Sequence, residues 1–190
     1  MWAAVLVSVV LVLAGCGTSP KTSFYMLTVT PGTGPAALSR PRPVQVAAVH
    51  VPPSLDRKQM VRMTEGQAVS ISETDRWSAP FGEMVRNVLS EDLEARLPKG
   101  TVILPDAPAP AQTAAIVVTV SSFAPDERGQ VSLRGSWALM DPHSGTPALT
   151  RQIDLQEQGG PSAGAAAGAM SNVLGQLAND IASTLGHPSL

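Results

Sequence analysis

Short stretches of apolar and β-branched residues recur along the chain and predict β-strands. Residues 24–29 combine aromatic and β-branched side chains, which favours a short strand. Residues 44–51 are almost continuously apolar, a pattern typical of a central strand that is buried on both faces. Residues 59–64 and 67–72 flank a Glu-Gly pair, and we expect them to form a hairpin with a two-residue turn.

Four further strands are predicted in the second half of the chain. The first is short and leads into a proline-rich loop, whereas the other three form a meander with turns rich in Asp, Gly, Pro and Ser. The strands cover residues 101–104, 115–123, 130–140 and 148–156, and the meander turns cover residues 125–129 and 141–145. We interpret the acidic residues and the histidine of these turns as solvated turn residues, not as catalytic groups.

Two longer segments have apolar residues at spacings of three and four, which places them on one face of a helix. The first segment covers residues 78–97, with Ser78 as the expected N-cap and an i,i+4 ion pair between Asp92 and Arg96. The second has an apolar stripe from Ala163 to Leu185. The polar residues expected outside that stripe are Ser171, Asn172, Asn179 and Asp180.

The order of these elements predicts an α+β fold in a single domain. The chain has 190 residues, 44% of them hydrophobic, which is enough to bury one core. We expect an antiparallel or mixed sheet with the two long helices packed on one face. Residues 31–43 are rich in Pro and Gly and are expected to form a loop or linker.

Charge and composition argue against several classes of function. The net charge is -2 and neither sign forms a long run, so nucleic acid is not an expected partner. His50, His143 and His187 have no carboxylates at the spacing of a catalytic triad or a metal site. No common hydrolase, zinc-protease or dinucleotide-binding motif is present. We therefore expect no catalytic site, no metal site and no cofactor.

The only cysteine of the chain follows an N-terminal apolar run. Residues 3–14 are apolar apart from one serine, and this length fits the hydrophobic region of a signal peptide, not a membrane span. Residues 13–16, Leu-Ala-Gly-Cys, resemble the bacterial lipobox, in which the cysteine sulfur carries diacylglycerol and the new amino group is acylated. We expect Cys16 to be this lipid attachment point.

These expectations divide the chain into three parts. Residues 1–15 form a lipoprotein signal peptide, residues 16–43 a lipidated tether with a short strand, and residues 44–190 a globular periplasmic domain. No Lys or Arg precedes the apolar run, which departs from the usual signal-peptide pattern and leaves open whether translation starts at Met1 or upstream of it. Gly17, rather than an aspartate, follows the cysteine and favours an outer-membrane address.

Several motifs occur in an order that resembles the ABC-type transport auxiliary lipoproteins, a PqiC-like family. After Cys16 comes an aromatic Tyr-x-Leu strand at Tyr25, and a Val-x-x-Pro segment then leads into Leu-Asp-Arg. An Arg-Trp pair precedes the first helix. The matching motif residues are Tyr25, Leu55, Asp56, Arg57, Arg76 and Trp77.

The resemblance implies a non-enzymatic auxiliary subunit of a lipid-transport system built around MCE-domain proteins. Such a subunit would be anchored in the outer-membrane bilayer through acylated Cys16, face the periplasm and dock an MCE-domain partner. Whether it also forms a homo-oligomer is left open. The alternative function is a ligand-binding or lipid-binding lipoprotein with an apolar pocket in the periplasm.

Two interpretations of the Arg-Trp motif remain open at this point. In the structural interpretation, Arg57 and Arg76 bond Asp56, Asp75 or nearby carbonyl groups at the helix start. In the functional interpretation, the arginines and Trp77 form a docking surface, because Arg and Trp are common at the centres of interfaces.

Overall fold

The computed structural model describes residues 20–32, 34 and 42–186. Cys16, the expected signal peptide and much of the 31–43 loop lie outside the described residues. From the N- to the C-terminus, the elements are β1 (Ser23–Tyr25), β2 (Val44–His50), β3 (Gln59–Met63), the 3-10 helix η2 (Glu65–Gln67), β4 (Val69–Trp77), α2 (Phe81–Glu94), β5 (Val102–Ile103), β6 (Ala114–Pro125), β7 (Gln130–Met140), β8 (Pro147–Gln158) and α3 (Ala163–Gly186).

The larger sheet has five strands in the order β5-β2-β6-β7-β8. Strands β6, β7 and β8 form the antiparallel meander predicted from the sequence. Its turns are closed by carboxylates, since Asp126 Oδ1 accepts the N–H groups of Arg128 and Gln130, and Asp141 Oδ1 accepts those of His143 and Ser144. These carboxylates therefore have the turn role expected of them.

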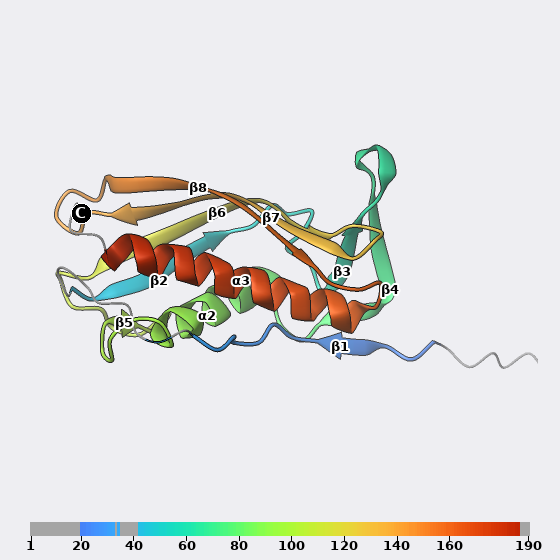
Figure 1. The fold of residues 1–190 in the computed structure, drawn as a ribbon, viewed down its shortest axis with the longest axis horizontal. Coiled ribbons are helices and arrows are strands. Elements are labelled where there is room, and N and C mark those ends of the chain that lie inside the picture. The colour runs from blue at the N-terminus through green and yellow to red at the C-terminus, as the bar shows by residue number, and fades with distance from the viewer. Residues whose placement is uncertain (1–19, 33, 35–41, 187–190) are drawn as a thin grey trace, which may run out of the picture.

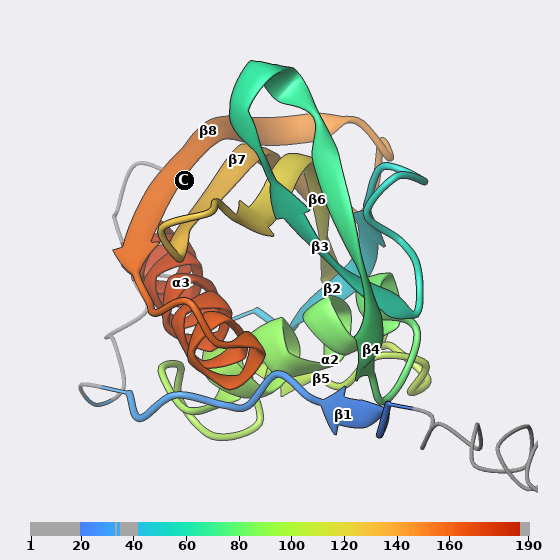
Figure 2. The same cartoon turned by 90° about the vertical axis from the view of Figure 1, so that its right-hand side faces the viewer.

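Both long helices cover the same face of this sheet (Figure 1). Helix α2 packs against β2 and β5, and α3 packs against β6, β7 and β8. Seen along its length, the molecule has the sheet curving around the two helices (Figure 2). The predicted α+β class, with a mixed sheet and two helices on one face, is confirmed.

A second sheet was not predicted. It has the order β1-β4-β3, with β1 parallel to β4 and β3 antiparallel to β4. The β3–β4 hairpin projects from one end of the molecule (Figures 1 and 2). Its connection is longer than the expected two-residue turn because η2 lies between the strands, with Gly66 at a φ of 71°. Strand β4 also runs on to Trp77, where the sequence pattern suggested an end near residue 72.

The positions of two other elements differ from the sequence prediction. Strand β2 is the second strand from the sheet edge, and its side chains beyond Val46 are only partly buried or exposed. A continuous apolar run therefore did not mean burial on both faces. Helix α2 begins at Phe81 instead of Ser78, because β4 extends to Trp77 and Pro80 occupies the position before the helix.

The core lies between the five-stranded sheet and the two helices. Trp77 stacks on Phe81 with ring centroids 5.1 Å apart, and Phe81 lies 5.6 Å from Phe123 of β6. This aromatic group joins the end of β4, the start of α2 and the larger sheet. The largest fully buried side chains are Phe81, Phe123, Leu89, Leu93, Ile116, Leu133, Leu139, Met170, Leu174, Leu177, Ile181 and Val46.

Candidate functional site

The motif residues that are far apart in the sequence meet at the start of α2. Tyr25 of β1 is the register partner of Trp77 of β4, and the backbone N–H of Ser78 donates to the Tyr25 carbonyl oxygen (2.8 Å). The N–H of Trp77 donates to the carbonyl oxygen of Lys58 (2.7 Å). The backbone around the Leu-Asp-Arg segment, β1 and the helix start is thus one hydrogen-bonded junction.

Asp56 supplies a cap for α2 from a distant part of the chain. Its Oδ1 accepts the backbone N–H of Gly82, in the first turn of the helix (3.1 Å). A carboxylate at a helix N-terminus satisfies an unpaired N–H group and interacts favourably with the helix dipole. Leu55, its neighbour, is 7% exposed and belongs to the core. The expected Ser78 cap is therefore replaced by Asp56.

Arg57 and Arg76 lie at the same junction, and both are half-buried. The Nε atom of each is buried without a hydrogen-bond partner among the described residues. Asp75 accepts a hydrogen bond from Ser72, and Asp56 accepts one from Gly82. The ion pairs of the two arginines with these aspartates, which the structural interpretation expected, are absent from the described structure. Trp77, in contrast, is 5% exposed and is a core residue.

The chain continues from β1 along both helices. We call residues 23–31, which include β1, the N-terminal strap. The N–H of Leu27 points to Sδ of Met84 on α2 (3.4 Å), and the N–H of Thr28 donates to Oγ of Ser171 on α3 (3.1 Å). Ser171 is buried, contrary to the prediction that it lies outside the stripe, because its hydroxyl binds the strap.

The end of the strap is held by a buried ion pair between Asp92 and Arg96 (3.0 Å), whose side chains are 0% and 4% exposed. Asp92 Oδ1 accepts both the N–H and the hydroxyl of Thr30, each at 2.9 Å. Arg96 donates to carbonyl oxygens of Thr30 and Pro31 and, through Nε, to Oδ1 of Asn179 on α3 (2.6 Å). The pair joins the strap, α2 and α3.

Burial raises the pKa of Asp92 above its ordinary value, although hydrogen bonds from Thr30 and the charge of Arg96 act in the opposite direction. Its Oδ2 has no hydrogen-bond partner among the described residues. The strap can approach this closely because position 175 is glycine: a Cβ there would lie 2.0 Å from Oγ1 of Thr30. The sequence showed the i,i+4 spacing of Asp92 and Arg96, but nothing in it placed residue 30 beside them.

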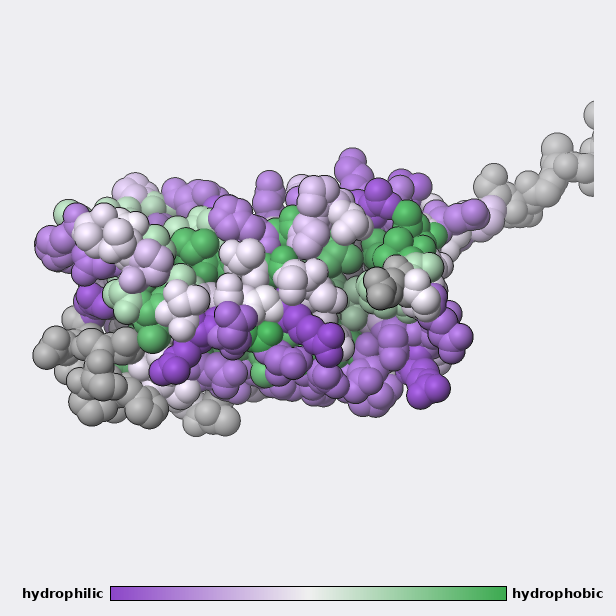
Figure 3. All heavy atoms as spheres, turned by 90° about the horizontal axis from the view of Figure 1, so that it is seen from above, coloured by the Kyte–Doolittle hydropathy of each residue, from purple (hydrophilic) through white to green (hydrophobic). Residues whose placement is uncertain are grey.

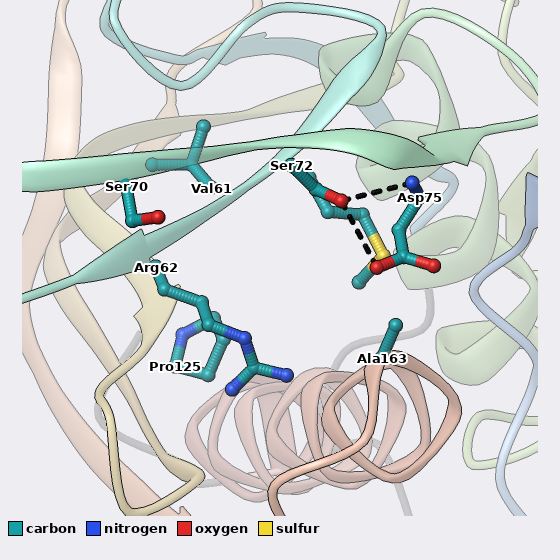
Figure 4. A pocket seen from close by; sticks show the side chains of 8 residues that line it. Val61, Arg62, Ser70, Ser72, Asp75, Pro125 and Ala163 are labelled. Atoms are coloured by element: carbon teal, nitrogen blue, oxygen red, sulfur yellow. Dashed lines mark hydrogen bonds between the residues drawn. The ribbon is translucent and has the colours of Figure 1, made fainter. Parts of the chain in front are cut away.

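A pocket of about 170 Å³ lies between the hairpin and the start of α3 (Figure 4). Arg62 points across it and donates to the carbonyl oxygens of Asp126 (3.4 Å) and Pro161 (2.7 Å). Ser72 donates to Oδ2 of Asp75 (3.0 Å), and no histidine lines the pocket to act as a base. These polar groups hold the hairpin against the domain and do not form a nucleophile–base pair.

A second cavity, of about 400 Å³, lies at the surface between the strap and α2. Apolar side chains including Met26, Val29, Met84 and Val88 line it, with Glu83 and Glu91 on the helix side. Over the described ranges, no three His, Cys, Asp or Glu side chains lie close enough together to bind a metal ion. Within the same part of the chain, no helix is both long and apolar enough to span a bilayer.

A family model described as "ABC-type transport auxiliary lipoprotein component" matches residues 25–182. The chain belongs to this family. The proteins named Intermembrane transport lipoprotein PqiC from Escherichia coli and Shigella flexneri are each 31% identical to it over 129 residues, which is 67% of this chain and 68% of theirs. The resemblance inferred from the sequence motifs is confirmed, and the family is one of auxiliary transport lipoproteins.

Two solved structures share the fold. The crystal structure of an uncharacterised protein has a TM-score of 0.74 at 22% identity and covers 87% of this chain and 99% of its own. A crystal structure from Xanthomonas campestris has a TM-score of 0.67 at 15% identity, covering 86% of this chain and 95% of its own.

Replacing Trp77 with Ala should lower the free energy of unfolding by about 3–5 kcal/mol, because it removes a buried ring that stacks on Phe81. Urea titration followed by circular dichroism measures this change. The matched control is Arg76→Gln, on the neighbouring half-buried residue, which should change stability far less. Equal, small effects of both substitutions would contradict the core role of Trp77.

Replacing Asp92 with Ala should lower the free energy of unfolding by about 3–5 kcal/mol, because it leaves the buried Arg96 guanidinium without its counter-charge. The control is Asp154→Ala, which breaks the exposed Arg134–Asp154 pair and should have an effect of less than about 1 kcal/mol. Denaturant unfolding of both variants gives the comparison. If the two substitutions had the same effect, the buried pair would not hold the strap.

Proposed function

We propose that this family member is a lipid-anchored, non-enzymatic subunit of an MCE-type transport system that docks its periplasmic partner at the outer membrane. The observation that carries the proposal is the strap, because it fastens the segment that follows Cys16 to both helices of the domain. The family match and the name of the E. coli relative, an intermembrane transport lipoprotein, support the same role.

The anchor is the acylated Cys16. Each buried methylene of an acyl chain contributes about 0.8 kcal/mol, and two or more chains on one residue hold a protein stably on a bilayer. Seven residues lead from Cys16 to Ser23, the first residue of β1. An extended chain of that length spans at most about 25 Å, so β1 stays close to the bilayer surface.

The hydrogen bonds of Asp56, Asp92 and Arg96 support a mechanical role over a catalytic one. Asp56 caps α2, and Asp92 and Arg96 hold the strap, so these ionisable groups are used in hydrogen bonds that fix the backbone. The domain then acts as a platform that the strap bonds join to the segment following its anchor. Docking a partner on this platform brings the end of a periplasm-spanning protein to the outer membrane.

Replacing Cys16 with Ser should abolish acylation and the signal-peptide cleavage that follows it, because the thiol is the attachment point for the lipid. Cells labelled with radioactive palmitate and fractionated into inner membrane, outer membrane and soluble fractions test this. Gly17→Ala, which keeps the thiol, is the control and should be labelled and recovered in the outer membrane. Label on the Cys16→Ser protein would contradict the anchor.

The wild-type lipoprotein, solubilised in detergent, should retain the MCE-domain protein of its transport system in a pull-down. Arg57→Gln should weaken this binding about tenfold, since Arg57 is only partly buried and arginine is common among the residues that dominate interface energies. Arg151→Gln, on exposed β8, is the matched control and should bind as the wild type does. Absence of binding by the wild type would overturn the docking role.

The alternative, a ligand-binding lipoprotein, draws on the apolar cavity of about 400 Å³ beside the strap. A carrier should retain a ligand in a one-to-one ratio when purified, whereas a docking subunit should not. Native mass spectrometry of the detergent-solubilised protein distinguishes them. A bound lipid lost on Val88→Trp, which fills the cavity, would favour the carrier.

A further inference from the structure

Large exposed apolar side chains lie at two places on the three-stranded sheet, at β1 and near the tip of the hairpin. We define the apolar end group as Phe24, Met26, Val69 and Ile71, whose exposed fractions are 67%, 61%, 45% and 42%. The first two lie on β1 or directly after it, and the other two lie on β4 in the projecting hairpin. Figure 3 shows hydrophobic side chains at the hairpin end, on a face where polar and hydrophobic patches alternate.

The side chain of Phe24 is held facing outward. Side chains alternate along β1, and its neighbour Tyr25 packs against the core beside its register partner Trp77. Phe24 is therefore on the opposite face, beside Arg76, which is its own register partner. Because the strap is bonded to α2 and α3, β1 cannot rotate to bury Phe24 without breaking those bonds.

The polar surroundings of this group suit a lipid surface. Arg76, the register partner of Phe24, is only partly buried, and a guanidinium is well shaped to bind phosphate oxygens. The exposed charges nearby are of both signs, with Lys21 and Lys58 against Glu65 and Glu73. A contact at this end is thus driven by apolar side chains and not by net charge.

The short segment between Cys16 and Phe24 supports the bilayer as the surface that covers the apolar end group. The described chain begins at this end of the molecule (Figure 1), and eight residues lead from Cys16 to Phe24. Such a segment spans at most about 29 Å. With the acyl chains of Cys16 in the bilayer, Phe24 lies within about 29 Å of the membrane surface, so this end of the domain can reach the bilayer.

We propose that the apolar end group inserts into the outer-membrane bilayer surface, with Arg76 beside lipid phosphates, and so fixes the orientation of the domain. The proposal rests on the lipid anchor of the proposed function and adds a second, noncovalent contact to it. Insertion of Phe24 and of the hairpin, at two separate points, prevents the domain from rotating about a single tether.

The test uses the acylated full-length protein in vesicles of phosphatidylethanolamine and phosphatidylglycerol. Acylation blocks the only native thiol, so a cysteine introduced by Phe24→Cys or Ile71→Cys can be labelled alone with an environment-sensitive fluorophore. Leu104→Cys is the matched control, because Leu104 is a 47% exposed apolar residue that follows β5 at the other end of the molecule. Circular dichroism checks that each variant is folded.

Labels at positions 24 and 71 should shift their emission to the blue on vesicles, be quenched by nitroxide lipids and become several-fold less accessible to iodide than the label at position 104. Equal accessibility of all three labels on vesicle-bound protein would overturn the inference while leaving the anchor intact. Protection that appears only after the MCE-domain partner is added would also overturn it and would assign the group to the partner. If the native Cys16 is labelled and the protein does not float with vesicles, the anchor itself fails.

Discussion

The buried pair of Asp92 and Arg96 is the interaction on which the arrangement of the N-terminal segment depends. An ion pair in a protein interior is tolerated only when its remaining donors and acceptors are satisfied. Here, the strap bonds most of them through the N–H, hydroxyl and carbonyl groups of Thr30 and the carbonyl of Pro31, and Asn179 accepts from Arg96 Nε. Only Oδ2 of Asp92 has no partner among the described residues. The core between α2 and α3 is therefore complete only when the strap is in place.

The strap contacts α2 at both of its ends. At the start of the helix, the Tyr25 carbonyl accepts the N–H of Ser78, and near its end, Thr30 meets Asp92 and Arg96. Between them, Thr28 is bonded to Ser171 of α3. A load applied to the chain before β1 is thus shared by β4, α2 and α3 instead of being taken up by a loose linker.

The elements with strong local signals could be predicted from the sequence. The meander, its carboxylate-closed turns and the apolar stripe of α3 depend on alternation, turn residues and helical spacing, all of which are local patterns. The second sheet could not be predicted, because the parallel pairing of β1 with β4 joins segments about fifty residues apart. The cap of α2 could not be predicted for the same reason, because Asp56 bonds Gly82, which lies 26 residues later in the chain.

Burial of polar residues was the other feature that sequence patterns missed. Asp92 and Arg96 have the spacing of an exposed helical ion pair, and Ser171 is a polar residue at the border of an apolar stripe. All three residues are buried because the strap covers them. The sequences of the two helices alone give no sign that another segment packs there. The family was recognised correctly, but the sequence could not separate the core role of Trp77 from the half-buried position of Arg76.

A fixed strap matters for a docking subunit because association costs translational and rotational freedom. A domain on a long flexible tether would present its surface in every orientation, and a partner would have to restrict that motion on binding. Here, ordered structure begins within seven residues of Cys16, and the strap bonds hold the domain to that segment. With Cys16 acylated as proposed, this short connection would keep the domain near the bilayer before a partner arrives, and less translational freedom would then be lost on binding.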